Sequence, residues 1–316
     1  MIICRKRIVL SAILIAIACA MCFLSHRYKL FAFNISHYEG NEGFSIMTYN
    51  ISAYDSASFT PDRQHRLIEL IKQEKPDFLC FQEMSFESLK QIKPQLDSIY
   101  GSCDVLKGDN QLWRLRFYSH YPLRNFRRYR CEGVIDISGF TEEEKAVVEL
   151  FQKQMNVMSA EFEVEPGRWV TVFSSHLRSS AYSTARRSMN KGASWFEGLS
   201  LYKRNYDVGK RIRDYETQNV RRFVEEAQTQ RKPVIIAGDL NDWCGSDCLN
   251  TLMGDDLKDA WWEGGNGFGW TYFGWHLRLR LDHILYSDKL ELVDVKVIDS
   301  DLSDHKPLVA RFRFLK

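Results

Sequence analysis

The feature that most constrains the fold of this chain is a series of short apolar runs that each end in a polar side chain. Asn50 ends the run SIMTYN, Glu83 ends DFLCFQE and His176 ends VTVFSSH, while Asp239 and Asn241 follow VIIAG. Short apolar runs bounded by turn residues indicate buried strands. Because binding and catalytic groups concentrate in loops at the ends of rigid elements, these polar residues are candidates for one shared site.

Near the C-terminal end, one further strand begins with an acid–histidine pair and another strand follows such a pair. Asp282 and His283 open the strand DHILYS, and Asp304 and His305 precede the strand KPLVARF. These pairs add two carboxylates and two histidines to the candidate set.

The remaining pattern predicts many strands with few helices between them. Pro61 follows the N-cap residue Thr60 and opens a helix, residues 141–154 form a second helix, and residues 206–228 form a third. Residues 156–175 form a hairpin around Pro166-Gly167, and residues 177–205 are expected to be irregular. We therefore expect two sheets with helices outside them.

The N-terminal region has the pattern of a membrane signal. Arg5, Lys6 and Arg7 precede an uncharged run over residues 8–24. About 17–25 apolar residues can span a bilayer, and bases before such a run favour a cytoplasmic N-terminus. We expect residues 1–7 to be a cytoplasmic tail and residues 8–24 an anchor, although Arg27 and Lys29 weaken this orientation.

Two other interpretations of the N-terminal run stay open. The motifs Ala16-Ile17-Ala18 and Ala18-Cys19-Ala20 are possible signal-peptide cleavage sites, and Cys19 is a possible lipidation site. All three interpretations export residues 44–316, either anchored to the membrane or secreted into the periplasm or beyond. Residues 25–43 are expected to be a linker, and export would permit a Cys244–Cys248 disulfide.

Charge excludes one class of protein. The chain has 43 bases and 41 acids among 316 residues, but five of the bases and no acid lie in residues 1–38. The rest of the chain therefore carries a net charge of −3, which excludes a strongly basic nucleic-acid coat protein. The length and the 45% hydrophobic content are sufficient for a large globular domain.

The residue types at the strand ends suit metal-assisted phosphoester chemistry. Oxygen ligands from Asn50, Glu83 and Asp304 suit Mg²⁺ or Mn²⁺, and no His/Cys spacing indicates zinc. Asp282 can orient His305 as an acid–base group. Two further residues, His176 and Asn241, can donate hydrogen bonds to phosphate oxygens. Each residue taken alone is more often a turn, cap or surface residue, so the prediction depends on the whole set.

Seven motifs in this order resemble the endonuclease/exonuclease/phosphatase superfamily, over about residues 44–314. They are MTYNIS (47–52), DFLCFQE (77–83), FYSHYPL (117–123), VFSSHLRS (172–179), VIIAGDLND (234–242), RLDHILYS (280–287) and LSDHKPL (302–308). The segment GNGFGWTY (265–272) is similar to one in membrane-anchored bacterial members. The resemblance implies an α/β (α+β) four-layer sandwich, with two mixed β-sheets packed face to face and helices outside.

The resemblance also implies a role for each matching residue. Glu83 corresponds to the principal metal ligand, with Asn50 and Asp304 close to the metal. Asp239 and Asn241 correspond to residues that orient the attacking water and the phosphate. His176 corresponds to a donor to the phosphate, and His305, oriented by Asp282, to a base or phosphate-polarising group. Whether His305 or Asp239 accepts the proton of the water stays open.

We therefore predict a Mg²⁺-dependent (or Mn²⁺-dependent) phosphoester hydrolase, most simply a nuclease-like phosphodiesterase that acts as a monomer outside the cytoplasmic membrane. The basic stretches 107–130 and 177–232 can attract a polyanion such as nucleic acid, or they can be ordinary solvated charge. A phospholipid or phosphorylated head-group esterase is the alternative. A silent phosphate-binding module is a lesser alternative, because such a module would be expected to lose part of the polar set.

Overall fold

The computed structural model describes residues 19–27, 29–34, 42–101, 115–152, 157–179, 194–274 and 277–315. The predicted cytoplasmic tail, residues 8–18 of the predicted anchor and parts of the predicted linker lie outside these residues. Within the described segments, no helix combines the length and the apolar character needed to cross a bilayer.

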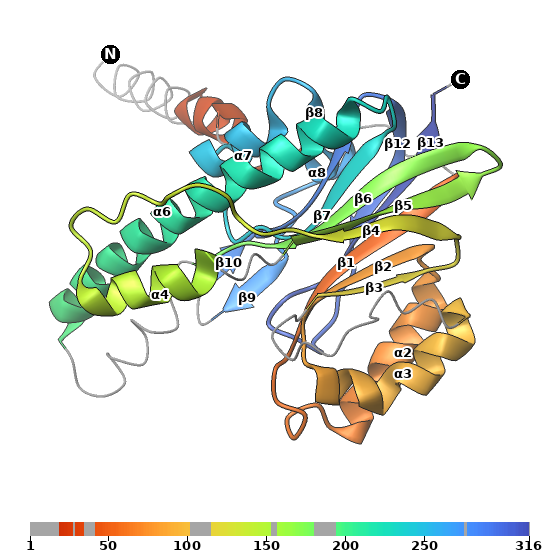
Figure 1. The fold of residues 1–316 in the computed structure, drawn as a ribbon, viewed down its shortest axis with the longest axis horizontal. Coiled ribbons are helices and arrows are strands. Elements are labelled where there is room, and N and C mark those ends of the chain that lie inside the picture. Colours follow the sequence, from red (N-terminus) through yellow and green to blue (C-terminus); the bar gives the residue numbers. More distant parts are fainter. Residues whose placement is uncertain are drawn as a thin grey trace, which may run out of the picture.

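Two mixed sheets form the centre of the fold (Figure 1). The five-stranded sheet contains, in spatial order, β12 (Leu290–Val297), β13 (Leu308–Phe314), β1 (Phe44–Ala53), β2 (Phe78–Met84) and β3 (Arg116–Ser119). The six-stranded sheet contains β4 (Leu123–Arg128), β5 (Val157–Glu165), β6 (Arg168–His176), β7 (Val234–Asp239), β11 (Asp282–Ser287) and β8 (Leu257–Asp259). A separate two-stranded ribbon pairs β9 (Tyr272–Gly274) with β10 (Leu277–Leu279).

Helices α2 (Pro61–Glu74) and α3 (Phe86–Tyr100) cover the outer face of the five-stranded sheet, and α6 (Trp195–Gln228) and α7 (Asp247–Met253) cover that of the six-stranded sheet. Helix α4 (Glu142–Gln152) packs against α6 instead, and α8 (Ala260–Gly264) contributes Ala260 and Trp261 to the core between the sheets. Buried residues of α2 and α3 share an apolar cluster with the five-stranded sheet, and buried residues of α6 and α7 share one with the six-stranded sheet. The predicted four-layer sandwich is confirmed.

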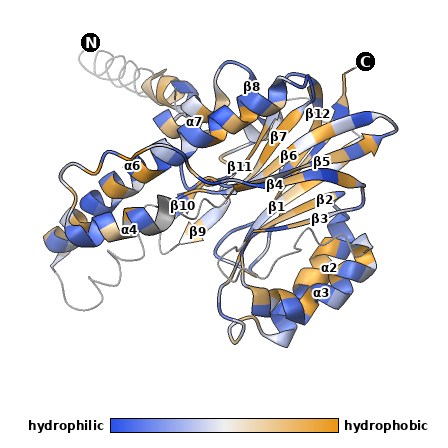
Figure 2. Ribbon diagram, viewed as in Figure 1, coloured by the Kyte–Doolittle hydropathy of each residue, from blue (hydrophilic) through white to orange (hydrophobic). Residues whose placement is uncertain are grey.

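The central core lies between the two sheets, where apolar strand faces meet (Figure 2). Phe162 of β5 is fully buried there, with its ring 4.8 Å from that of Phe78 and 5.9 Å from that of Phe117. Both contacts are edge-to-face, an arrangement that aromatic rings favour. Aromatic packing of this kind fixes how the two sheets face one another.

The prediction that residues 177–205 are irregular is wrong for their C-terminal part. Helix α6 begins at Trp195 and not near residue 206. Its N-terminus is a capping box, in which the Ser194 side chain accepts from the backbone N–H of Glu197 and the Glu197 side chain accepts from the N–H of Ser194. The Ser-x-x-Glu pattern at residues 194–197 is a local signal in the sequence for a helix that begins here.

Part of the predicted linker is attached to the domain. Ala32 and Gly267 exchange two backbone hydrogen bonds of 3.0 and 2.9 Å. The Asn34 side chain donates to the carbonyl oxygen of Gly265 at 2.7 Å, and the backbone N–H of Asn34 donates to Asn266 Oδ1 at 2.9 Å. Residues 29–34 therefore pack as part of the domain surface.

The two cysteines considered for a disulfide, Cys244 and Cys248, are both buried free thiols. The Cys248 thiol donates to Asp214 at 2.9 Å.

We expect Phe162→Ala to lower the free energy of unfolding by about 3–5 kcal/mol, because it removes a fully buried ring between the sheets. Val134→Ala, at a position that is 88% exposed, should change it by less than about 0.5 kcal/mol. Urea unfolding measures both values, and equal losses in the two variants would contradict this account of the core.

Candidate active site

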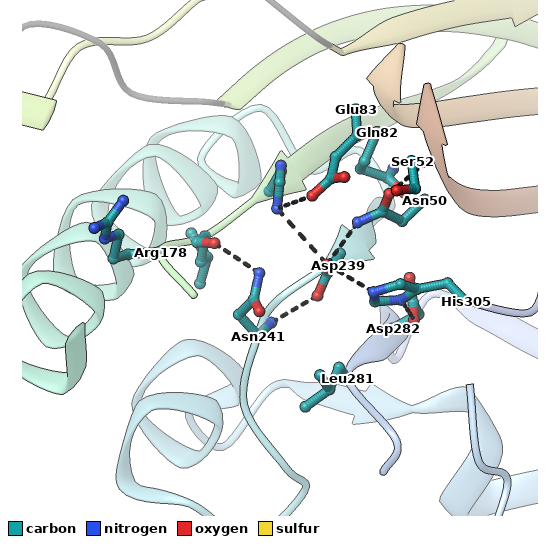
Figure 3. Close-up of polar contacts among 12 residues, drawn as sticks. Asn50, Ser52, Gln82, Glu83, Arg178, Asp239, Asn241, Leu281, Asp282 and His305 are labelled. Carbon is teal, nitrogen blue, oxygen red and sulfur yellow. Dashed lines mark hydrogen bonds and ion pairs between the residues drawn. The ribbon is translucent and has the colours of Figure 1, made fainter. Parts of the chain in front are cut away.

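Three strands of the six-stranded sheet place one polar residue each in a single row. Strands β6 and β7 are parallel, and their register pairs His176 with Asp239. Strand β11 is antiparallel to β7, and its first residue, Asp282, is paired with Asp239. Since neighbouring strands are about 4.8 Å apart, the register alone brings these side chains together at one edge of the sheet (Figure 3).

Glycine at position 238 permits the close approach of β6 and β7 beside this row. A Cβ atom at Gly238 would lie 1.8 Å from the carbonyl oxygen of Ser175. Any larger residue would therefore push the two strands apart next to His176 and Asp239.

The five-stranded sheet contributes Asn50 and Glu83 from the parallel strands β1 and β2. Their pairing shifts register between Asn50 and Ala53, so Glu83 lies at a bulge. Ser52, Glu83 and Asn241 all have positive φ, at 49°, 58° and 52°. Such backbone is uncommon for residues other than glycine and gathers at functional sites.

Asp239 is the centre of the site and is only 1% exposed. Its Oδ2 accepts from Asn50 Nδ2 at 2.9 Å and lies 3.6 Å from Nε2 of both His176 and His305. Its Oδ1 accepts from the backbone N–H of Asn241 at 3.0 Å. One carboxylate thus contacts residues from both sheets, as Figure 3 shows.

Asn241 and His176 are held together by the segment that follows β6. The Asn241 side chain donates to the carbonyl oxygen of Leu177 at 2.9 Å, and the backbone N–H of Leu177 donates to the carbonyl of Asp239 at 3.0 Å. These two residues therefore lie on the same side of Asp239.

Glu83 is nearly buried but lacks a strong partner. Its side chain is 13% exposed, and within the described segments its one polar contact is His176 Nε2 at 3.6 Å. Buried carboxylates are normally paired with a cation or bound to a metal. Glu83 therefore fits the role of a metal ligand.

His305 and Asp282 form a buried pair. The Nδ1–H of His305 donates to Asp282 Oδ2 at 2.7 Å. Burial alone would lower the pKa of His305, but the carboxylates of Asp282 and Asp239 raise this pKa to about 10. Burial raises the pKa of Asp282, and the positive charge of His305 opposes that shift. The pair is suited to hold a proton beside Asp239.

Asp304 lies at the margin of the site. It is exposed, and among the described residues its side chain makes no hydrogen bond or ion pair with Glu83, Asn50 or Asp239. Ser303 Oγ bridges the region, at 2.8 Å from the carbonyl oxygen of Asn50 and 3.2 Å from Asp304 Oδ1. The structure thus brings Asn50 and Glu83 close together. Asp304 is connected to the backbone of Asn50 through the hydroxyl group of Ser303.

The side chains that come close enough to share one metal ion form a different set. Ligand atoms of Asp239, Asp282 and His305 all lie within 4.8 Å of one another. The predicted ligands Asn50, Glu83 and Asp304 are not part of this trio, so the structure offers two adjacent groups of donors.

Thr271 is a supporting residue to which the sequence analysis gave no role, although its segment GNGFGWTY was noted. Its Oγ1 accepts from the backbone N–H groups of Leu281 and Asp282 at 3.1 and 3.0 Å. The next residue, Tyr272, forms an isolated β-bridge with His305, and their ring centroids are 5.0 Å apart. This segment therefore positions both members of the histidine–aspartate pair.

Two buried residues of α6 hold the strand end behind His176. The backbone N–H of Arg178 donates to Glu216 Oε2 at 2.8 Å, and the carbonyl of Arg178 accepts from Arg213 at 2.9 Å. Arg213 also pairs with buried Asp242 at 3.4 Å. The sequence pattern predicts a helix over residues 206–228 but does not indicate this support, because the contacts join segments that are distant in sequence.

A buried charge cluster supports the other side of the site. Arg280 donates to both oxygens of Asp259 at 2.8 and 2.7 Å, and His283 contacts Asp259 through Nδ1 at 2.9 Å and the carbonyl of Asp242 through Nε2 at 2.9 Å. Burial opposes the shift, but Arg280 and His283 hold the pKa of Asp259 well below its usual range. His283, unlike His305, is therefore a structural residue.

Many bases of the two basic stretches are paired within the domain. Arg124 contacts Glu161, Arg127 contacts Glu226 and Arg204 contacts Glu144, at 2.9, 3.1 and 2.7 Å. These pairs favour ordinary structural charge for these positions over a surface that attracts a polyanion.

We expect Thr271→Val to lower the free energy of unfolding by about 1–3 kcal/mol, because two backbone N–H groups lose their acceptor. Thr271→Ser keeps the hydroxyl and should lower the free energy of unfolding by less than half as much. Urea unfolding of the two variants measures the difference, and equal losses would show that the hydroxyl does not support the site.

Glu216 makes stability depend on pH. Burial raises its pKa from 4.5 to about 7, although the N–H of Arg178 opposes the shift. Because the folded chain holds this proton more tightly than the unfolded chain, the free energy of unfolding falls as pH rises from about 4.5 through 7.

Glu216→Gln removes this titration. Between pH 5 and pH 8, the free energy of unfolding of the wild type should fall by about 2–3 kcal/mol more than that of the variant. Parallel pH profiles of the two proteins, measured by urea unfolding, would contradict the assignment.

Comparison with solved structures shows the same fold in proteins of low sequence identity. The human Nocturnin catalytic domain, solved with a bound sulfate anion, matches with a TM-score of 0.58 and 17% identity, over 86% of this chain and 94% of that chain. ANGEL2, described as a 2',3'-cyclic phosphatase and solved with adenosine-2',3'-vanadate, matches with 0.60 and 14%, over 88% and 97%. TDP2 of D. rerio, solved with a single-strand DNA product, matches with 0.56 and 14%, over 86% and 100%.

Among curated proteins, the UPF0294 protein of Vibrio cholerae is 31% identical over 123 residues. The match spans 37% of this chain and 40% of the length of that relative. The sequence pattern of the Endonuclease/Exonuclease/phosphatase family matches residues 47–305, which include every site residue described above. The chain therefore belongs to the Endonuclease/Exonuclease/phosphatase family, whose members are phosphoester hydrolases.

Proposed function

We propose that the chain is a metal-dependent phosphodiesterase with Asp239 at the centre of its active site. The observation that carries this proposal is the set of contacts to Asp239 Oδ2, which accepts from Asn50 and lies 3.6 Å from both His176 and His305. A carboxylate between two imidazoles can orient a water molecule and exchange its proton.

The donor set of the site fits a hard divalent cation. Three carboxylates, on Glu83, Asp239 and Asp282, lie near two histidines, and Asp304 lies at the margin of the site. In the described segments, no lysine or arginine forms an ion pair with these four acids. Oxygen ligands of this kind suit Mg²⁺ or Mn²⁺. Glu83 would be the principal ligand, with Asn50 and Asp304 beside it. The ion would supply charge stabilisation at a phosphoryl oxygen.

The residues around Asp239 have separate roles in the proposed reaction. His176 and Asn241 lie on one side of Asp239 and are placed to donate hydrogen bonds to non-bridging phosphate oxygens. His305 lies on another side, oriented by Asp282. Asp239 Oδ2 and His305 Nε2 lie 3.6 Å apart, and both groups are placed beside the position of the attacking water, where one of them would accept its proton.

A phosphodiester of the nucleic-acid type is the first substrate class. It is supported by the fold shared with TDP2, solved with a DNA product, and with ANGEL2, described as a cyclic phosphatase. A phosphorylated lipid head group is the second class. It is supported by the exposed apolar side chains of residues 21–33, which include Phe23 and Phe33 at 69% and 76% exposure. We further propose that residues 8–24 anchor the enzyme, with the domain outside the cytoplasmic membrane.

Glu83→Gln should lower kcat by at least about 100-fold, because it removes a charged ligand from the proposed metal site. The matched control is Glu87→Gln, an exposed glutamate of α3 that pairs with Lys90 and should keep full activity. The full-length protein in detergent would be assayed on bis-p-nitrophenyl phosphate, DNA, RNA and phospholipid, with Mg²⁺, Mn²⁺ or EDTA.

The outcomes of this assay separate the proposals. Metal-dependent cleavage of DNA or RNA that Glu83→Gln abolishes supports the phosphodiesterase. Cleavage of phospholipid alone moves the head-group esterase to first place. Turnover that is as fast with EDTA as with Mg²⁺ or Mn²⁺, or as fast in Glu83→Gln as in the wild type, overturns the metal site. If none of the substrates is turned over, a silent binding module is favoured.

A further inference from the structure

Exposed apolar side chains are concentrated at the N-terminal end of the described chain. Seven of the fourteen large apolar residues that are exposed in the described segments lie in residues 21–33 or at Phe268. Phe33 is 76% exposed, Leu30 47%, Phe268 44% and Phe31 42%. We call these four residues the apolar collar. They lie at the base of the helix formed by residues 19–27, which projects from the domain beside α7 in Figure 1.

The collar is rigidly attached to the catalytic domain. Ala32 exchanges two backbone hydrogen bonds with Gly267, and Asn34 donates to the carbonyl oxygen of Gly265 and to the side chain of Asn266. The rings of Phe31 and Phe268 meet edge to face with their centroids 5.0 Å apart. The collar thus combines two segments that are more than 230 residues apart in sequence.

The chemistry around the collar fits a lipid surface better than a protein. The projecting helix contains the end of the apolar run 8–24, with Met21 and Phe23 more than 60% exposed. Arg27 ends this helix, Lys29 lies between the helix and the collar, and residues 1–38 contain no acid. Bases at the edge of an apolar surface favour anionic lipid head groups, and aromatic rings favour the membrane interface. Trp270 stacks on Phe268, with the ring centroids 4.7 Å apart, and adds a further aromatic ring beside the collar.

We propose that the apolar collar lies in the interfacial region of an anionic bilayer and holds the catalytic domain in a fixed orientation on that surface. This inference rests on the proposed membrane location and not on the proposed reaction. It differs from anchoring by residues 8–24, because an anchor on a free tether would leave the domain without a preferred orientation.

The collar and the active site share one loop. Gly267 pairs with Ala32, and four residues later Thr271 accepts hydrogen bonds from the backbone of Leu281 and Asp282. Tyr272 then contacts the ring of His305. If Phe268 contacted lipid, only a short segment of chain would therefore separate the bilayer surface from the residues that contact the His305–Asp282 pair.

The experiment uses full-length protein in vesicles of neutral and anionic phospholipid, with and without bromine on the acyl chains near the glycerol backbone. Phe33→Trp and Phe268→Trp each add one reporter to the collar, and Val134→Trp adds one at an 88% exposed position outside it. The added emission is the difference from wild type, which has eight tryptophans. We expect brominated lipid to quench at least half of the added emission in both collar variants and little of it in Val134→Trp.

The controls separate this proposal from the others. If the protein floats with the vesicles but neither collar reporter is quenched, the collar proposal is wrong and the anchor stands. If the protein does not float, both membrane proposals are wrong. If a collar reporter is shielded from soluble quencher only at high protein concentration and not by lipid, a second copy of the chain covers the collar and the proposal is overturned. Turnover of bis-p-nitrophenyl phosphate in the same samples reports on the reaction independently.

Discussion

Hydrogen-bond register across β6, β7 and β11 is the constraint on which the rest of the site depends. It fixes His176, Asp239 and Asp282 in one row without any contribution from the side chains themselves. A slip of one residue in a strand would turn its side chain to the opposite face of the sheet. The aromatic core then sets the distance between the sheets, so that Asn50 reaches Asp239 from the other one.

The electrostatics of the site follow from this placement. Asp239 and Asp282 are almost completely buried, and burial without compensation is costly for a carboxylate. His305 offsets part of the cost, which is why the pKa of its imidazole lies far above the ordinary value. In the function we propose, a divalent cation balances the remaining negative charge, which is centred on Glu83.

The sequence predicted the strand ends well because an apolar run followed by a polar residue is a local pattern. It also predicted the helix that begins at Pro61, where the cap and the proline are adjacent. Contacts between distant segments could not be predicted in the same way. The hydroxyl of Thr271, the Arg213–Glu216 support and the docking of Asn34 depend on tertiary packing that no local pattern contains. The start of α6, in contrast, can be predicted from the sequence, because the capping signal at Ser194 is a local pattern.

The pairing of Ala32 with Gly267 has a consequence for how the domain is delimited. Residues 29–34 lie outside the matched family region, and a boundary drawn at the first strand would exclude them. A fragment that starts at Phe44 would keep every residue of the Asp239 row but would remove the two backbone hydrogen bonds that Ala32 makes to Gly267, so that the carbonyl of Gly267 would keep the hydrogen bond from the Trp261 side chain. The loop that carries Thr271 and Tyr272 would then lose part of its attachment to the domain. The folded unit of this chain thus begins before the region that matches its family.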